Sequence, residues 1–350
     1  MNKPNSQITT TPLWEWVGRR PKVCVSCATF NHAPYITQAM NGFCMQQVDF
    51  PFICVIIDDA STDGAQQVIR QYLNEQFEPL SLLSEGREEV FHHKTNPNCY
   101  FVVYLLEENH YSQGKSPLLY ANTWMEQSDY VALCEGDDYW TDKHKLQKQA
   151  DALDANPQAT LVYTNFRVID GEGKPISRAY IKDFPGRSHS GDNLPMLLRY
   201  GNYVMTFTTM YRHEVLQSDA YKNNPYKLDF GLTLASALMG DFIWFPEKTA
   251  CYRSLQSGMI MSNHPKVIQM TKDIYCYYAG LLMNGQCKPL SLSQRINLTT
   301  LILIWALKKK DYQLRKETLS ASKLSRLLLP VAYIRLKSER LKDRIERINK

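Results

Sequence analysis

Apolar positions in the first 170 residues alternate between short continuous runs and stretches spaced three and four apart. The continuous runs are rich in β-branched and aromatic residues and end at polar turns, as buried strands do. They predict strands over 22–30, 50–59, 101–108, 130–138 and 160–170. The spaced stretches predict helices over 35–47, 61–76, 116–128 and 144–157. This alternation is typical of an α/β fold with a doubly wound, mainly parallel sheet flanked by helices.

The pattern weakens after about residue 186. It predicts a short helix and a strand within 193–216, a helix over about 231–238 and a short strand that contains Pro246. From Val267 onward the chain reads as helical. We therefore expect a polar leader over 1–20, one domain over 21–262 with halves that meet at 165/166, and a helical C-terminal extension over 263–350.

Polar residues gather where three of the predicted strands end, at 28–31, 56–61 and 134–138. In a doubly wound sheet, ligands bind outside the carboxyl ends of the strands. The three segments should therefore lie at one edge of the sheet and form a ligand site.

The segment CEGDD ends with two adjacent carboxylates, Asp137 and Asp138. Adjacent carboxylates repel each other unless a positive group lies near them, and Mg²⁺ or Mn²⁺ is one such group. The alternative is a turn in which Asp138 or Thr141 caps the following helix. The pair Asp58–Asp59 lies at another strand end, where an acid next to a helix N-terminus can accept hydrogen bonds from a ribose or a base edge. The alternative is that Ser61 or Asp63 caps the following helix while Asp58 and Asp59 are solvated.

Several classes of protein are disfavoured by the sequence. The turn after the first strand has neither GxGxxG nor a P-loop, which argues against Rossmann dehydrogenases and P-loop enzymes. Cys24 and Cys27 lie in a predicted strand, where their spacing puts them on opposite faces, so we expect buried thiols. Residues 308–350 hold 14 basic and 5 acidic residues, a net charge of +9, whereas the rest of the chain carries −4. A mildly acidic body does not suit nucleic-acid binding.

Three segments together resemble the family 2 glycosyltransferases, inverting enzymes with the GT-A fold. They are VSCATFNHAPYITQAMNGFCMQQ, FICVIIDDASTDGAQQVIRQY and YVALCEGDDYWTDKHKLQKQADALDANP, and the order and spacing match over roughly residues 20–260. The resemblance implies a nucleotide-diphosphate sugar donor, most simply a UDP-sugar, bound by the half over 21–165, and an acceptor half over 166–262.

The resemblance also implies roles for individual residues. Thr29, Phe30 and Asn31 would lie along the uridine, Asp59 would accept a hydrogen bond from the base, and Lys115 would approach the nucleotide. Asp137 would contact the ribose, and Asp138 would ligate the Mn²⁺ or Mg²⁺ ion that bridges the diphosphate. Arg253, in the CYR segment, would contact the diphosphate. The histidine that many members have a few positions later is absent here, and His264 is too distant to replace it.

An inverting transfer needs a base that deprotonates the acceptor hydroxyl. By resemblance this is Asp229, in the segment YKLDFGLTL, and the alternative is that Asp229 caps a helix starting at Phe230. The competing acid, Asp241, reads as a turn residue between helix and strand.

The C-terminal tail interleaves basic residues with Leu, Ile, Val and Tyr, and Pro330 should break it into two amphipathic pieces. Such a tail suits an anionic membrane surface. The alternative is a solvated helix that packs on the body or in a coiled-coil-like contact.

The resemblance thus implies a cytoplasmic enzyme, peripheral at the inner face of the membrane if the tail binds there. It would transfer a sugar with inversion to a glycan or lipid-linked glycan during assembly of a capsule, O-antigen or exopolysaccharide. One alternative is a sugar-nucleotide nucleotidyltransferase, although the first turn lacks the Gly-rich stretch of those enzymes. Another is an inactive relative that binds the sugar nucleotide or acts as a scaffold in an assembly complex.

Overall fold

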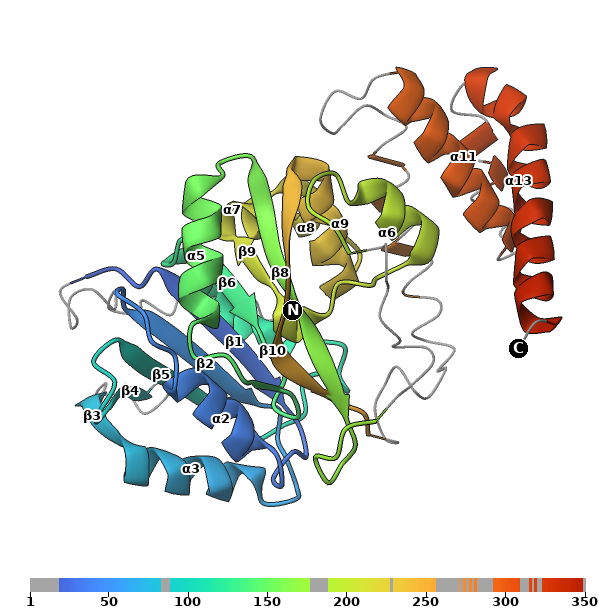
Figure 1. Cartoon of the computed structure of the whole chain (residues 1–350). Coiled ribbons are helices and arrows are strands. Elements are labelled where there is room, and N and C mark those ends of the chain that lie inside the picture. Colours follow the sequence, from blue (N-terminus) through green and yellow to red (C-terminus); the bar gives the residue numbers. More distant parts are fainter. Residues whose placement is uncertain are drawn as a thin grey trace, which may run out of the picture. The chain divides into compact units, whose positions relative to one another are not determined.

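The computed structural model describes residues 19–82, 89–176, 188–226, 229–255, 292–308 and 323–348, with single residues between 270 and 281 and between 315 and 319 (Figure 1). They divide into two compact units. Unit 1 comprises residues up to 183, 204–214 and 243–255. Unit 2 comprises 184–203, 215–242 and 256–350. The predicted leader lies almost wholly outside the described residues, and the predicted domain boundaries stay predictions.

A ten-stranded sheet has four adjacent parallel strands at its centre, in the order β5-β2-β1-β6. Their bounds are β1 (Val23–Thr29), β2 (Phe52–Asp58), β5 (Cys99–Leu105) and β6 (Tyr130–Leu133). All four had been predicted from their apolar runs. Such runs suit central parallel strands because both faces of these strands are covered.

Antiparallel strands extend the sheet on both sides of this block. On one side are β3 (Phe77–Leu82) and β4 (Glu89–His93), and on the other β9 (Met210–Arg212), β8 (Ala159–Ile169), β10 (Asp241–Arg253) and β7 (Tyr139–Trp140). The α/β fold class is confirmed, but the sheet is mixed rather than mainly parallel. The sequence pattern missed β3 and β4 because proline, glutamate and histidine interrupt their apolar residues.

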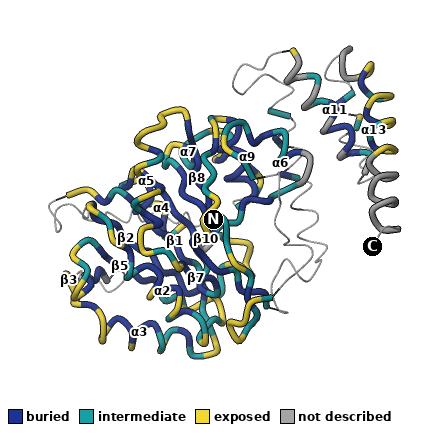
Figure 2. Tube along the Cα trace, in the orientation of Figure 1, coloured by how far each residue is buried: buried dark blue, intermediate teal, exposed yellow. Residues whose placement is uncertain are grey.

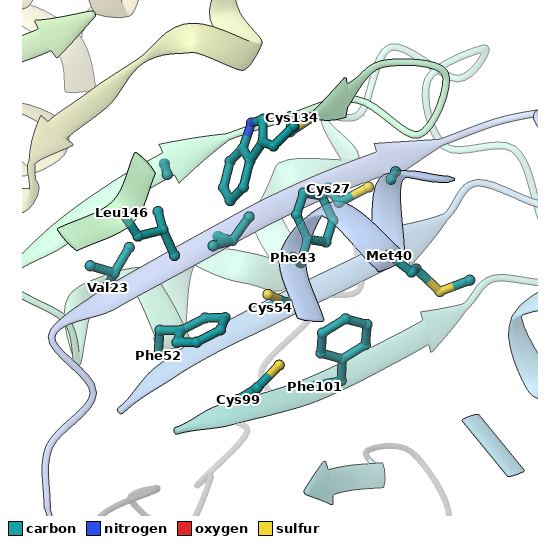
Figure 3. Packing of buried hydrophobic residues seen from close by; sticks show 14 of the residues in the cluster. Val23, Cys27, Met40, Phe43, Phe52, Cys54, Cys99, Phe101, Cys134 and Leu146 are labelled. Atoms are coloured by element: carbon teal, nitrogen blue, oxygen red, sulfur yellow. The ribbon is translucent and has the colours of Figure 1, made fainter. Parts of the chain in front are cut away.

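Helices cover the parallel strands on both faces. On one face α2 (Ile36–Cys44), α3 (Ala65–Gln76) and α5 (Lys145–Ala155) share a single apolar core with alternate residues of β1 and β2. Figure 3 shows Phe43 of α2 packed over Cys54 and Phe101 in this core. The short helices η1 (Pro117–Ala121) and α4 (Asn122–Glu126) pack on β1 and β2 from the other side. In Figure 2 the central strands are accordingly buried, whereas the outer side of α3 is exposed.

The described residues of unit 2 are mainly helical. They form α6 (Leu194–Tyr200), α8 (Asp219–Lys222), α9 (Asp229–Met239), α11 (Leu292–Lys308) and α13 (Lys323–Ile348), and α7 (His213–Gln217) begins in unit 1 and ends in unit 2. The helical C-terminal part is thus confirmed. Among the described helices, none is both long enough and apolar enough to span a bilayer.

The prediction that Pro330 breaks the tail into two pieces is wrong, because α13 continues through it. A proline inside a helix removes one backbone hydrogen bond and costs about 3 kcal/mol. Leu328, Ala332 and Leu336 bury apolar surface against α11 on both sides of the proline, which offsets that cost.

Candidate functional site

The three polar strand ends predicted to share one edge of the sheet do so. Thr29 at the end of β1 is in register with Asp58 at the end of β2, and β6 runs parallel to β1 on its other side. The N–H of Asp59 donates to the Thr29 carbonyl over 3.0 Å, and the N–H of Gly136 donates to the Ala28 carbonyl over 3.1 Å. Backbone hydrogen bonds therefore continue the sheet into the segments that carry the acids.

Side chains of the second segment support the turn after β1. Asn31 adopts a left-handed backbone (φ 56°), which asparagine tolerates better than most residues. Its N–H donates to the Ser61 hydroxyl, and its side-chain oxygen accepts the Thr62 N–H, each over 2.8 Å. Ser61 in turn donates to the buried Asp58 carboxylate. Phe30, at the tip of this turn, remains 42% exposed, so its ring is available to a ligand.

Asp59 fastens a third loop to the same edge. Its two carboxylate oxygens accept the backbone N–H groups of His110 and Tyr111, over 2.7 and 2.9 Å. The predicted residue Lys115 lies at the end of this loop. Its N–H donates to the His110 carbonyl, and its exposed ammonium group donates to the side-chain oxygen of Gln113. Asp59 therefore holds the loop that brings Lys115 to this part of unit 1.

Asp138 is a buried carboxylate and does not cap a helix. It is 4% exposed, and its Oδ1 accepts the Arg253 N–H over 2.7 Å. Burial raises its pKa well above the usual range, and the charges of Asp137 and Glu135 raise it further. The following helix, α5, starts only at Lys145. Because adjacent acids raise the pKa of Asp138, a bound cation would stabilise its charged form.

His32 is a residue of this site that the sequence analysis did not single out. Its Nδ1 lies 3.2 Å from the Thr29 hydroxyl, and its Nε2 lies 3.8 Å from a carboxylate oxygen of Asp137. It links the first and third polar strand ends, through Thr29 and Asp137. The position of a histidine directly after the first strand's turn is the one signal that could have found it.

Gly136 lets residues Glu135–Asp138, which we call the acidic turn, approach the end of β1. A Cβ atom at this position would lie 2.4 Å from the Thr29 hydroxyl oxygen, 2.7 Å from the Thr29 Cβ and 3.0 Å from a methyl group of Ile36. No larger residue fits there without movement. The glycine of the EGDD segment is therefore required by the close packing of Asp137 and Asp138 against β1.

Arg253 stabilises the acidic turn by hydrogen bonds to Asp137 and Asp138. The side chain is 2% exposed, and its guanidinium lies over the Tyr35 ring, 4.3 Å from the ring centroid. It donates to the carbonyls of Asp137, Asp170 and Gly171, over 3.0 to 3.3 Å, and to the Gln38 side chain. The planar guanidinium suits such a fork of acceptors. Arg253 thus ties α2, the acidic turn, the end of β8 and β10 together, whereas a contact with a diphosphate stays a prediction.

The carboxylate oxygens of the acidic turn fit a hard divalent cation that also binds oxygen atoms of a ligand. In the described parts of the chain, no three His, Cys, Asp or Glu side chains converge as metal ligands. The protein could therefore supply one or two carboxylate oxygens, from Asp138 and Asp137. Mg²⁺ and Mn²⁺ are often bound in this way, with the remaining positions taken by phosphate and water.

Asp229 lies in unit 2, as the first residue of α9. Its Oδ2 accepts a hydrogen bond from the Asn202 side-chain amide over 3.0 Å, and its carbonyl accepts from the Thr233 hydroxyl. Burial, with a further contribution from Asp229, raises the pKa of Tyr221 to about 12. The Oδ1 of Asn202 is buried and has no hydrogen-bond partner. Asp241 is the exposed first residue of β10 and follows the end of α9 by two residues, so it lies at the junction between helix and strand.

The chain has relatives in sequence and neighbours in structure. No family model matches the chain. An uncharacterized protein of Mycobacterium tuberculosis is 30% identical over 234 residues, which cover 66% of this chain and 58% of that protein. An uncharacterized glycosyltransferase of Nostoc sp. is 26% identical over 66% of this chain and 64% of that protein. The putative teichuronic acid biosynthesis glycosyltransferase TuaG of Bacillus subtilis is 25% identical over 45% of this chain and 52% of that protein.

Among solved structures, S. aureus TarS residues 1–349 in complex with UDP-GlcNAc match with a TM-score of 0.53 and 17% identity. The match covers 89% of this chain and 79% of that one. This chain spans little more than half the length of the mycobacterial relative. The comparisons confirm the fold, and with the two named relatives they confirm the resemblance to GT-A-type glycosyltransferases.

Proposed function

We propose that this chain, a relative of GT-A-type glycosyltransferases, transfers a sugar from a nucleotide-diphosphate donor to an acceptor hydroxyl with inversion. The observation that carries the proposal is the acidic turn Glu135–Asp138, which packs against Thr29 at the carboxyl edge of the parallel strands, where the Thr29 carbonyl accepts the Asp59 N–H. This edge is where such sheets bind nucleotides. A UDP-sugar is the donor we favour, because a structure of the same fold holds UDP-GlcNAc.

Different residues of unit 1 would bind different parts of the sugar nucleotide. The exposed ring of Phe30 offers a stacking surface for the base, beside Asn31 and Asp59. Asp137 would face the ribose, and Asp138 with Asp137 would hold a divalent cation next to the diphosphate. When bound, that cation offsets the negative charge that develops on the leaving diphosphate.

The transfer itself needs a base on the acceptor side. We assign this role to Asp229, whose carboxylate is oriented by the Asn202 amide. Its proton acceptance and the attack of the hydroxyl on the anomeric carbon form one displacement, in which the bond to the diphosphate breaks. We expect a glycan or lipid-linked glycan as acceptor, because the relative TuaG is named for teichuronic acid biosynthesis. The setting would be the inner face of the cytoplasmic membrane.

Donor hydrolysis tests the proposed mechanism without knowledge of the acceptor. Water replaces the acceptor hydroxyl, and NMR detects the sugar released from a panel of α-linked UDP-sugars with Mn²⁺. We expect the β-anomer to appear first with one donor. Asp229→Asn should abolish its release, whereas Asp241→Asn, which changes a turn acid, should not. Initial release of the α-anomer would refute inversion, and tight UDP binding without any turnover would favour the inactive scaffold.

A further inference from the structure

Between residues 326 and 338, where burial is described, helix α13 carries apolar residues on two sides, one buried and the other exposed. Leu328, Ala332 and Leu336 are buried and form a cluster with Leu303 and Ile304 of α11. Their spacing of four residues places them along one side of α13. These contacts account for the packing of the two helices against each other.

The second side of α13 is exposed to solvent. Leu327, Val331 and Ile334 are 73%, 48% and 70% exposed, and spacings of four and three residues align them on one stripe. Four of the ten exposed large apolar residues in the described part of the chain lie between 327 and 334. In the sequence, Leu341 follows Ile334 after seven residues, and Ile345 and Ile348 follow at spacings of four and three. We call Leu327, Val331 and Ile334 the apolar stripe.

Basic residues accompany the stripe. Arg326 and Lys337 are exposed, and Arg335 follows Ile334 directly. Over its whole length α13 has eight basic and three acidic residues, a net charge of +5. The continuity of the helix through Pro330 matters here, because it keeps the stripe and these charges on one rod of about 39 Å at 1.5 Å per residue.

We propose that the apolar stripe of α13 lies on an anionic lipid surface. An amphipathic helix binds such a surface by burying apolar side chains at the acyl boundary, while Lys and Arg interact with the headgroups. Charge complementarity favours an anionic lipid surface over a second copy of this chain, because a second α13 would bring its own net charge of +5 next to the first. The proposal does not rest on the glycosyltransferase assignment.

The test is flotation of the full chain with vesicles of phosphatidylcholine alone and with 30% phosphatidylglycerol, without nucleotide. We expect at least tenfold stronger partitioning to the anionic vesicles, and at least a fivefold loss between about 0.1 and 0.5 M salt. The double variant Leu327→Ser/Ile334→Ser should lower partitioning at least tenfold. The matched control is Leu292→Ser, which alters a 67% exposed leucine at the start of α11 and should bind like the unaltered chain.

A second variant keeps the test decisive if the stripe variant misfolds, which circular dichroism would show. Arg326→Gln/Lys337→Gln removes two exposed charges and one exposed hydrogen bond, from Arg326 to the Leu319 carbonyl, and should remove most of the preference for anionic vesicles. Equal binding to both vesicle types, or binding that is insensitive to both double variants, would overturn the proposal. The proposal would also be overturned if the chain forms a dimer that dissociates in the stripe variant. The same holds if the chain binds an acidic protein but does not bind vesicles.

Discussion

Gly136 provides the sharpest prediction, because its surroundings leave no room for a side chain. The Cβ of an alanine there would lie 2.4 Å from the Thr29 hydroxyl oxygen and 2.7 Å from the Thr29 Cβ, whereas non-bonded atoms pack at about 3.5–4.0 Å. The acidic turn and the end of β1 would have to separate by about 1 Å. Overpacking of this kind costs about 1–3 kcal/mol of stability.

The larger effect of Gly136→Ala should be on the site. A displacement of about 1 Å moves Asp137 and Asp138 away from the donor, and misplacements of this size cost about 100-fold in rate. We therefore expect the variant to remain folded, with UDP affinity in Mn²⁺ lowered at least tenfold and donor hydrolysis lowered about 100-fold. Calorimetric titration and the hydrolysis assay measure these quantities.

Gly171→Ala is the matched control for this experiment. Its Cβ would meet only the Tyr35 hydroxyl at 3.4 Å and a Leu255 methyl at 3.6 Å, both ordinary contacts, so affinity and rate should be unchanged. If Gly136→Ala binds UDP as well as the unaltered chain, close packing of the acidic turn against β1 is not what positions the carboxylates, and the site geometry derived above is wrong.

Three further predictions concern buried polar groups. Arg253→Lys keeps the charge but loses the fork to the Asp137, Asp170 and Gly171 carbonyls, so it should cost about 3 kcal/mol in urea unfolding; a loss below about 0.5 kcal/mol would contradict the bracing role. Lys145 is fully buried, and burial lowers its pKa to about 7, whereas in the unfolded chain it stays protonated to about pH 10.4. Its burial penalty is therefore full below pH 7 and relieved as pH rises, so the free energy of unfolding relative to Lys145→Met should increase by up to about 1.4 kcal/mol per pH unit between pH 7 and 9; parallel curves would contradict this. Asn202→Ala removes the amide that orients Asp229 and should lower kcat about tenfold with the donor KM unchanged; a higher KM at constant kcat would instead indicate a binding role.

The parts of the fold that the sequence predicted are those with strong periodicity. The central strands and α2, α3, α5 and α9 have apolar patterns that distinguish buried from exposed positions. The antiparallel strands β3 and β4 were missed because cross-strand pairing, of β3 with β4 and of β4 with β5, and not their own pattern, stabilises them. Pro330 was misread because packing against α11 outweighs a local penalty.

The candidate site was predicted as a set of residue types but not as a set of contacts. The acids at 59, 137 and 138 could be placed at one edge because parallel strands share their carboxyl ends. The contacts of Asp59 with the loop at 110–111, and of Arg253 with the acidic turn, join residues that are 51 to 116 positions apart in sequence. Local patterns do not encode such pairings, and the same holds for His32 and Asn202.

The central claim is that the acidic turn binds a nucleotide diphosphate together with a divalent cation. Calorimetric titration of UDP, with GDP and CMP for comparison, tests it directly when done with and without Mn²⁺ on the unaltered chain, Asp138→Asn and the control Asp142→Asn. We predict that UDP binds only with Mn²⁺, that Asp138→Asn lowers the affinity at least 30-fold, and that Asp142→Asn leaves it unchanged. Equal UDP binding with and without Mn²⁺ and in all three proteins would contradict the claim.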